Sequence, residues 1–533
     1  MTDEKVNLVT LENPILRGFN PDPSIVRVGD DYYIVVSSFE WLPGIRVYHS
    51  SDLIHWMHYT DLLTNQVNLQ GNPIDCSIWA PQLSFSNGRY YCVYTNIRNT
   101  TRPFKDGHNY LITATDMKGP WSAPIYLNSK GFDPSLYHDE EGRQWLLSVV
   151  WDYRKATSNK SVGICLQEYD GQLQQLVGPS YKIFDGTDLG KTEAPHLYYR
   201  GGYYYLLTAE GGTGEGHAVT VCRSKSLYGP YEVAPNSPIM TAYQRADSEF
   251  QCTGHGSLVQ SNHGQWYMSY LMTRPVENAA ILGRETSLQA VEWTEDGWLR
   301  LANGQTIPDK NFKIATNQLN TYQIKNRFND EFNLELKKEW NGRRQLPNAS
   351  WCDLKTRPHY LRMLSGESIQ STFDSHILAI RQRDFVFECE TAIEFVPQTF
   401  NQIAGLLLFL NEENYFYLGL TFDEKLGSVL RLMRCIRGEF YLFEKIVPIE
   451  KEKIALKVIV NHQFAQFYWK QEDWQPFLDE LDISFLAGGF TGNFIGVTVQ
   501  DLDRFNGSFA DFEYFRYQGK DVLNVNSYNN IER

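Results

Sequence analysis

The chain has 533 residues, of which 42% are apolar and 21% are charged. These ordinary globular proportions argue against a disordered or fibrous protein, and the length suits two or three domains. The formal charge of −14, with no long run of Lys or Arg, would repel nucleic acid and anionic lipid. We therefore expect neither a nucleic-acid partner nor a membrane partner.

The N-terminus and the cysteines bear on the compartment. Residues 1–13 carry acids where an export signal needs basic residues, and they contain no long apolar run. The longest apolar stretch, 404–410, is far shorter than the roughly 20 residues of a membrane-spanning helix. The eight cysteines include no Cys-x-x-Cys pair, which favours free thiols over a zinc ribbon. We therefore expect a soluble, cytoplasmic protein.

Residues 22–300 contain an internal repeat. Each of five segments begins with a turn-like tripeptide and continues through an apolar residue and a marked turn into an aromatic-rich strand. The segments start 53 to 61 residues apart, which is longer than the roughly 20 to 50 residues of most solenoid repeats. The tripeptides are Asp22-Pro-Ser, Ala80-Pro-Gln, Asp133-Pro-Ser, Ala194-Pro-His and His255-Gly-Ser.

Each repeat holds three or four short strands, which is enough for one antiparallel blade. Five such units fit a five-bladed β-propeller, whose blades pack radially around a central channel. If the repeats are equivalent, the five tripeptides lie at one height around the axis. Their first residues, with neighbouring Trp79 and Glu193, would then ring a single funnel.

The pattern changes after residue 300. Residues 302–311 are polar and turn-rich, and from residue 326 alternating strands return without the blade spacing. About two hundred residues of this kind suit a β-sandwich. We therefore predict an all-β chain with a five-bladed propeller over 1–305, a linker over 306–325 and a sandwich over 326–533.

Three acids fall at or beside the repeated inner position: Asp22, Asp133 and Glu193. A single Asp-Pro is more often a turn than a catalyst. Three convergent carboxylates, however, are costly to bury unless they bind a metal or share protons. Hydrolysis of an acetal uses such a set, since one carboxylic acid protonates the leaving oxygen and one carboxylate activates water. We therefore favour catalytic carboxylates.

A metal site is the competing interpretation. The three acids and His255 could bind a hard cation, but ligands from different blades form no loop motif to check, and no EF-hand is present. We expect no required cofactor and no catalytic metal. A structural divalent cation, such as calcium, on the axis near His255 stays open.

Seven ordered strings carry a family resemblance: Gly18-Phe-Asn-Pro-Asp-Pro-Ser, Ser38-Phe-Glu-Trp-Leu-Pro-Gly, Ile78-Trp-Ala-Pro, Gly131-Phe-Asp-Pro-Ser-Leu, Thr192-Glu-Ala-Pro-His-Leu, Leu207-Thr-Ala-Glu-Gly-Gly-Thr and Leu282-Gly-Arg-Glu-Thr. The chain resembles glycoside hydrolase family 43, and within it the two-domain β-xylosidases that often also act on α-L-arabinofuranosides. The resemblance extends to the C-terminal strands and implies a concanavalin-like jelly roll for the sandwich.

The resemblance implies a role for each acid. Asp22 would be the general base, Glu193 the general acid, and Asp133 the residue that modulates the acid's pKa and orients it. Family members invert the anomeric configuration, so we expect Asp22 and Glu193 to be separated by about 6.5 to 9.5 Å.

Further residues of these motifs are candidates to bind the sugar. The aromatic rings would stack on its C–H faces, and Arg284 would bind a hydroxyl. His255 is equally well interpreted as a core residue. The predicted substrate-binding residues are Phe39, Trp79, Trp151, Thr213, His255 and Arg284.

The resemblance also implies that a sandwich loop closes one side of the pocket. We place this loop within 501–509, with Phe505 or Phe509 as the ring that enters.

Two departures from the family pattern lie near the leaving-group side. This chain has Asp75-Cys-Ser shortly before Trp79-Ala-Pro, where relatives often have glycines, and it has Ala194 where a Gly is common.

We predict an inverting, exo-acting glycosidase that releases xylose from short β-1,4-xylooligosaccharides, with arabinofuranosidase side activity on arabinosyl-substituted oligosaccharides. Three alternatives stay open: a main arabinofuranosidase activity, a fructan or sucrose hydrolase, and a non-catalytic sugar-binding propeller. The Asn-Asp-Pro-Asn and Arg-Asp-Pro strings of the fructan enzymes are absent. Family members commonly form dimers or tetramers, so we expect a homo-oligomer.

Overall fold

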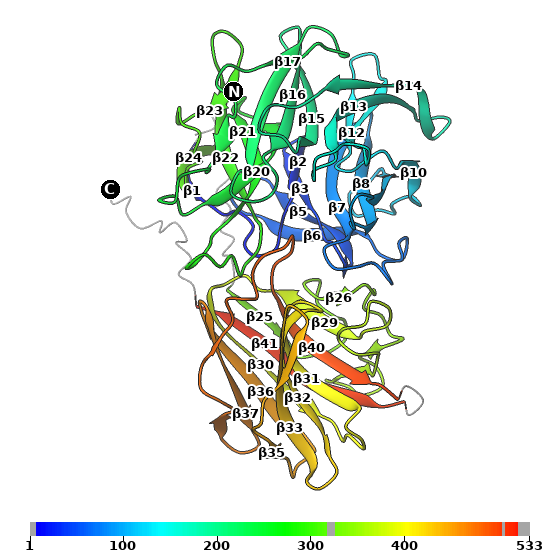
Figure 1. The fold of residues 1–533 in the computed structure, drawn as a ribbon, viewed down its shortest axis with the longest axis vertical. Helices are drawn as coiled ribbons and strands as arrows, with labels where there is room; N and C mark the ends of the chain where they lie inside the picture. Colours follow the sequence, from blue (N-terminus) through cyan, green and yellow to red (C-terminus); the bar gives the residue numbers. More distant parts are fainter. Residues whose placement is uncertain (1–6, 317–325, 504–506, 521–533) are drawn as a thin grey trace, which may run out of the picture.

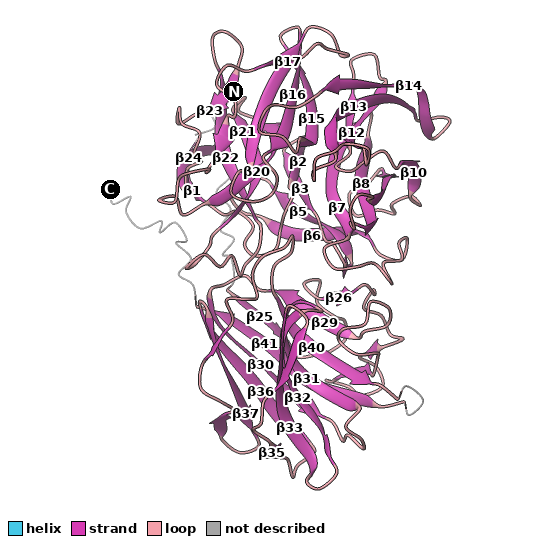
Figure 2. Ribbon diagram, viewed as in Figure 1, coloured by secondary structure: helices cyan, strands magenta, loops and turns pink. Residues whose placement is uncertain are grey.

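The protein is described by a computed structural model that covers residues 7–316, 326–503 and 507–520. All regular structure within these ranges is β-strand, and the strands form two bodies, one above the other (Figures 1 and 2). The predicted all-β class and the two-domain organisation are therefore confirmed. Among the described residues, no helix is long and apolar enough to cross a membrane.

Five antiparallel sheets form the upper body, one for each predicted repeat. The first two blades contain β2 (Ser24–Val28), β3 (Asp31–Val36), β5 (Gly44–Ser50) and β6 (Met57–Leu63), then β7 (Ser77–Ser86), β8 (Arg89–Asn99), β9 (Asp106–Ala114) and β10 (Ile125–Asn128). The third contains β11 (Ser135–His138), β12 (Gln144–Trp151), β13 (Ser161–Asp170) and β14 (Gln175–Phe184). The last two contain β15 (Glu193–Arg200), β16 (Tyr203–Glu210), β17 (Ala218–Ser224), β18 (Glu232–Val233) and β19 (Met240–Thr241), then β20 (Gln251–Gln260), β21 (Trp266–Thr273), β22 (Glu285–Trp293) and β23 (Leu299–Leu301).

The innermost strands β2, β7, β11, β15 and β20 contact one another in sequence, and β20 contacts β2, so the blades close into a ring. The two ends of the domain are joined by β1 (Asn7–Glu12), which pairs antiparallel with β24 (Asn311–Thr316). The predicted linker over 306–325 is therefore wrong for residues 311–316, which pair with the N-terminal strand of the propeller. Residues 317–325 lie outside the described ranges.

The five tripeptide heads share a backbone conformation. Their first residues all have positive φ: 56° at Asp22, 38° at Ala80, 52° at Asp133, 50° at Ala194 and 56° at His255. A non-glycine residue rarely adopts this left-handed conformation, which costs about 1–2 kcal/mol and tends to occur at functional sites. Its recurrence at all five heads shows that the repeats are structurally equivalent.

Two nine-stranded antiparallel sheets form the lower body. One contains β25 (Arg327–Asp330), β27 (Cys352–Asp353), β28 (Leu361–Leu364), β30 (Val386–Glu394), β36 (Lys453–Asn461), β37 (Phe464–Lys470), β38 (Trp474–Pro476), β39 (Leu481–Asp482) and β41 (Phe509–Gly519). The other contains β4 (Trp41–Leu42), β26 (Asn341–Arg343), β29 (Ile377–Arg381), β31 (Gln402–Asn411), β32 (Asn414–Asp423), β33 (Gly427–Ile436), β34 (Glu439–Leu442), β35 (Val447–Pro448) and β40 (Phe494–Asp501). Alternate residues of these strands fill a shared apolar core, which confirms the predicted sandwich.

The propeller contributes one strand to the sandwich. Strand β4 lies in the first blade's segment of the chain but pairs with β26. Trp41 of β4 is fully buried and stacks on Phe494, with 3.8 Å between ring centroids. Because one apolar cluster contains residues of both domains, the two domains pack as a single body at this face.

A buried ion-pair network lies beside this strand. Arg343 binds Glu40 of the propeller at 3.1 Å and Glu412 of the sandwich at 2.9 Å, and Arg344 also binds Glu412. Burial alone would raise the pKa of Glu412, but the two guanidinium groups lower it to about 2. All four side chains are almost inaccessible to solvent, so each depends on its partners to compensate for lost hydration.

We expect Arg343→Met to lower the free energy of unfolding by about 3–5 kcal/mol, because it leaves buried carboxylates without their main partner. Urea unfolding followed by tryptophan fluorescence measures the loss. The matched control is Arg357→Met, whose guanidinium is one-third exposed and pairs with Glu394 and Asp511, and which should cost about 1 kcal/mol or less. Equal losses in the two variants would contradict a stabilising role for the buried network.

The eight cysteines are all free, and seven of them are buried. The predicted free thiols are therefore confirmed. Burial raises the pKa of the Cys76 thiol to about 12, so it is protonated at neutral pH.

Candidate active site

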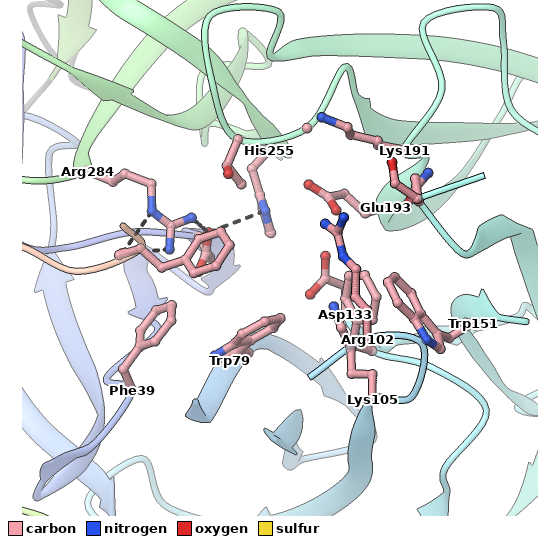
Figure 3. Close-up of a pocket in the computed structure, with 17 residues that line it drawn as sticks. Phe39, Trp79, Arg102, Lys105, Asp133, Trp151, Lys191, Glu193, His255 and Arg284 are labelled. Carbon is pink, nitrogen blue, oxygen red and sulfur yellow. Dashed lines mark hydrogen bonds and ion pairs between the residues drawn. The ribbon is translucent and has the colours of Figure 1, made fainter. Parts of the chain in front are cut away.

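A cavity of about 290 Å³ opens at the propeller axis, where the five inner strands begin (Figure 3). It contains all nine residues that the sequence predicted for the site. They are Asp22, Phe39, Trp79, Asp133, Trp151, Glu193, Thr213, His255 and Arg284. Of the five repeat heads, Asp22, Asp133 and His255 line this cavity, together with the predicted neighbours Trp79 and Glu193, whereas Ala80 and Ala194 do not.

Strand starts and bulges aim the three acids into the cavity. Asp22 and Asp133 lie two residues before β2 and β11, and Glu193 is the first residue of β15. The pairing of β15 with β16 shifts register between Glu193 and His196. Because a bulge redirects a side chain relative to a regular strand, Glu193 can face the axis while the rest of β15 packs within its blade.

Asp22 is held as a carboxylate by three neighbours. Arg284 donates to its Oδ1 at 2.6 Å, the Ser37 hydroxyl donates to its Oδ2 at 2.6 Å, and the Nδ1 atom of His255 lies 3.6 Å from Oδ1. Burial alone would raise the pKa of Asp22, but Arg284, His255 and Ser37 together lower it below its ordinary value. Asp22 is therefore ionised at neutral pH and can accept a proton.

Asp133 and Glu193 have the opposite character. Burial raises the pKa of Asp133 well above its ordinary value, and the charges of Glu193 and Asp22 raise it further. Burial likewise raises the pKa of Glu193, to about 7, against the lowering effect of Lys105. The backbone N–H of Ala194 donates to Asp133 Oδ2 at 3.1 Å, which ties the two acids together. This pair retains a proton near neutral pH, so Glu193 can serve as an acid.

Lys105 lies against the aromatic wall beside these acids. Its Nζ atom is 4.9, 3.8 and 4.3 Å from the ring centroids of Trp79, Phe132 and Trp151. Burial lowers the pKa of Lys105 to about 8, although Glu193 and Asp133 oppose this effect. The lysine is therefore mostly charged at neutral pH and stabilises the ionised form of Glu193.

A ring from the sandwich completes the pocket wall. Phe490, which lies between β39 and β40, lines the cavity and stacks on Phe39 with 6.3 Å between centroids and an interplanar angle of 16°. The prediction that a ring from 501–509 enters the pocket is wrong for Phe509, which lies on β41, is 41% exposed and packs under Arg362. Phe505 lies outside the described residues.

Backbone contacts hold the Phe490 loop against the propeller. The Phe490 carbonyl accepts from Nε and Nη2 of Arg284 at 3.1 and 2.9 Å, and its N–H donates to Asp75 at 3.3 Å. A Cβ at Gly492 would lie 2.5 Å from the Leu282 carbonyl, so only glycine allows this approach. Asp75, one of the two departures from the family pattern, therefore binds the sandwich loop instead of obstructing the pocket.

Two sequence profiles match the chain, one in each domain. Residues 11–299 match the profile described as glycosyl hydrolases family 43. The chain belongs to glycoside hydrolase family 43. Residues 329–518 match the profile described as the beta xylosidase C-terminal concanavalin A-like domain, which confirms the predicted class of the sandwich.

Similar proteins of this family cover nearly the whole chain. A protein named beta-xylosidase from Bacillus subtilis is 40% identical over 96% of this chain and 100% of its own length. A xylosidase/arabinosidase from Humicola insolens is 40% identical over 95% of this chain and 97% of its own. The solved structure of a xylan beta-1,4-xylosidase from Bacillus halodurans superposes with a TM-score of 0.93 at 43% identity, covering 95% of this chain and 100% of the other. The family is therefore assigned on both sequence and fold.

Sequence reasoning missed several residues of this family 43 pocket. Phe132 directly precedes Asp133 in its motif, and Lys191 lies two positions before Glu193, so proximity in sequence could have indicated both. Phe490 had a weaker signal, an aromatic ring between glycines. The missed lining residues are Arg102, Lys105, Phe132, Ser158, Asn159, Lys191, Gly212 and Phe490.

The axis near His255 offers few ligands for a hard cation. The neighbouring titratable side chains there include His196 and His217, whereas calcium takes six to eight oxygen ligands. Among the described residues, no group of three or more His, Cys, Asp or Glu could hold a metal ion. The side chains therefore do not fit direct calcium coordination, and a cation on the axis stays a prediction that needs water as its main ligand.

We expect the alkaline limb of kcat/KM for xylobiose to fall near pH 7, since the pKa of Glu193 is about 7 and activity needs its protonated form. Lys105→Met removes a charge that favours the carboxylate, so the pKa of Glu193 rises and this limb moves to higher pH. A pH series of initial rates measures the shift. Lys182→Met, at a half-exposed position on β14, is the control. A shift to lower pH in the Lys105 variant would contradict the assignment.

We expect Phe490→Ala to lower kcat/KM about tenfold, chiefly through KM, because it removes an aromatic wall but leaves the backbone that holds Arg284. Phe509→Ala, a matched deletion of an exposed ring on the same domain, should leave kcat/KM within about twofold. Initial rates on an aryl β-xyloside measure both variants. A larger loss of kcat/KM in Phe509→Ala than in Phe490→Ala would instead favour the prediction that a ring from 501–509 closes the pocket.

Proposed function

We propose that the protein is an inverting, exo-acting β-xylosidase that releases xylose from the non-reducing end of short β-1,4-xylooligosaccharides, with α-L-arabinofuranosidase side activity. The observation that carries this proposal is that carboxyl groups with lowered and with raised pKa values lie in one cavity. Asp22 has a lowered pKa, whereas Glu193 and Asp133 have raised ones. Such a division supplies both a base and an acid at the same pH.

The proposed reaction is a single displacement. Asp22 takes a proton from a water molecule, whose oxygen attacks the anomeric carbon of the terminal xylose from the α face. The bond from that carbon to the glycosidic oxygen breaks, and Glu193 gives its proton to this oxygen. Asp133, joined to the backbone next to Glu193, orients the acid, whose pKa is raised by burial and by the charge of Asp22. The products are α-xylose and the shortened oligosaccharide.

The position of Phe490 supports exo action. The ring comes from the sandwich and packs against Phe39 and Trp79 in the cavity wall, so a second domain closes one side of the site. A closed end suits a terminal sugar. The proposed compartment is the cytoplasm, where short imported oligosaccharides would be the substrates.

A digest of xylotetraose labelled at its reducing end tests the exo assignment. The proposal predicts xylose and labelled xylotriose as the first products. Labelled xylobiose appearing without xylose would contradict it. Parallel rates on an aryl β-xyloside and an aryl α-L-arabinofuranoside decide which activity is the main one, and absence of turnover on every substrate would favour the sugar-binding alternative.

A further inference from the structure

Three cationic side chains gather on one side of the cavity. Arg102 and Lys105 precede β9, and Lys191 precedes β15. In Figure 3 all three lie on the side of Glu193 and Trp151, whereas Arg284 lies on the opposite side. Arg102 and Lys191 are exposed and Lys105 is half-buried, so the group extends from the pocket wall to its rim.

Among the described residues, none of these three cations forms an ion pair, although Glu193 and Asp133 act on Lys105 at longer range. Figure 3 marks the ion pair between Arg284 and Asp22, and it marks none to the three other cations among the lining residues that it draws. Lys105 lies over aromatic rings, not on a carboxylate. The acids that remain on this side are Asp133 and Glu193, whose raised pKa values leave a proton on the pair near neutral pH. The side therefore carries excess positive charge, in a chain whose formal charge is −14.

The cations lie on the side that the leaving group would occupy. Glu193 would protonate the glycosidic oxygen, so the sugar beyond that oxygen must lie next to it. The charges of Lys105 and Lys191 both act on Glu193 and lower its pKa. A neutral sugar has no group that requires three cations, whereas a carboxylate binds guanidinium through paired N–H donors and ammonium as a point charge.

We propose that the leaving-group side of the pocket binds a carboxylate on the aglycone through Arg102, Lys105 and Lys191, so that xylosides of acidic sugars are preferred substrates. This inference rests on the proposed β-xylosidase function. An aldonate at the reducing end and a uronate on the adjacent xylose both supply the carboxylate. The bond changes are those of ordinary hydrolysis: water adds to the anomeric carbon, Asp22 takes its proton, Glu193 protonates the leaving oxygen, and the carboxylate is unchanged.

Xylobionate and xylobiitol provide a matched comparison. Both have an open-chain aglycone joined through the same secondary oxygen, and only xylobionate carries a carboxylate. At pH 6 we expect kcat/KM for xylobionate to exceed that for xylobiitol by about fivefold, the factor typical of a partly exposed charge pair. A ratio of one or below excludes an aldonate as the source of the carboxylate. If neither compound nor xylobiose is hydrolysed, the proposed function itself fails.

Two variants assign the effect to the cations. Arg102→Gln and Lys191→Gln should each reduce the ratio of the two kcat/KM values toward one, and Lys425→Gln, an exposed lysine on the sandwich, should leave the ratio unchanged. Thermal unfolding checks that each variant is folded. A ratio that stays above about three in both pocket variants overturns the assignment.

A second pair of substrates separates the two sources of the carboxylate. Xylobiose with a glucuronate on its reducing xylose is compared with the same compound reduced to glucose at that substituent. A preference in this pair alone assigns uronates, and a preference in the xylobionate pair alone assigns aldonates. No preference in either pair overturns the inference.

Discussion

Asp22→Asn is expected to abolish hydrolysis of every substrate, with kcat/KM reduced by about 10³- to 10⁴-fold. The amide cannot accept the proton of the attacking water, and it no longer carries the charge that Arg284 and His255 balance. The loss should be similar for xylobiose, an aryl xyloside and an aryl arabinofuranoside, because water must be activated in all three reactions. Initial rates with each substrate measure it.

A matched control separates chemistry from folding. Asp30→Asn makes the same change at an exposed turn of the same blade and should keep kcat/KM within about twofold. Binding of xylose by calorimetry should persist in the Asp22 variant, since the aromatic walls are intact. If Asp22→Asn retained more than about a tenth of the activity on any substrate, the assignment of the general base would be wrong.

Glu193→Gln is expected to have unequal effects on different leaving groups. Xylobiose leaves as a sugar alkoxide that needs a proton, so kcat/KM should fall by about 10³-fold. A 4-nitrophenyl xyloside leaves as a stable phenolate, so its loss should be at least tenfold smaller than that of xylobiose. The alkaline limb near pH 7 should also disappear from the residual aryl activity, because the group that titrates there is gone.

Glu232→Gln is the control for this variant. Glu232 is 68% exposed on the same blade and lies outside the cavity, so its replacement should change neither rate. Equal losses on xylobiose and the aryl xyloside in the Glu193 variant would contradict proton donation by this residue, and would leave it a role in binding alone.

The propeller and the three acids could be predicted because the signal is repeated in the sequence. Each tripeptide head recurs at a blade's length, and the heads of all five blades adopt positive φ at the same structural position. A ring of equivalent strands then brings Asp22, Asp133 and Glu193 together without any knowledge of side-chain packing. The closed topology converts a linear pattern into a three-dimensional site.

The sandwich contribution could not be predicted in the same way. Phe490 enters the pocket because Asp75 and Arg284 bind its backbone and Gly492 allows a close approach. These contacts join residues more than two hundred positions apart, and no repeating pattern in the sequence indicates them. The pairing of β24 with β1 was missed for the same reason, since it joins the two ends of the domain.

The cations of the pocket were missed for a different physical reason. Lys105 precedes a strand in an unremarkable polar segment, and a lone lysine or arginine is most often a solvated surface residue. Its significance follows only from its position above three rings and beside Glu193. Specificity on the leaving-group side therefore depends on where the loops lie, whereas the positions of the catalytic acids depend on strand register.

The stereochemistry of the first product tests the central claim most directly. Proton NMR of an aryl β-xyloside digest resolves the two anomers of xylose before they interconvert. A single displacement by water activated at Asp22, with Glu193 as the acid, predicts that α-xylose forms first and that the β anomer appears only by mutarotation. If β-xylose formed first, the reaction would proceed with retention, and the assignment of Asp22 as a general base would be contradicted.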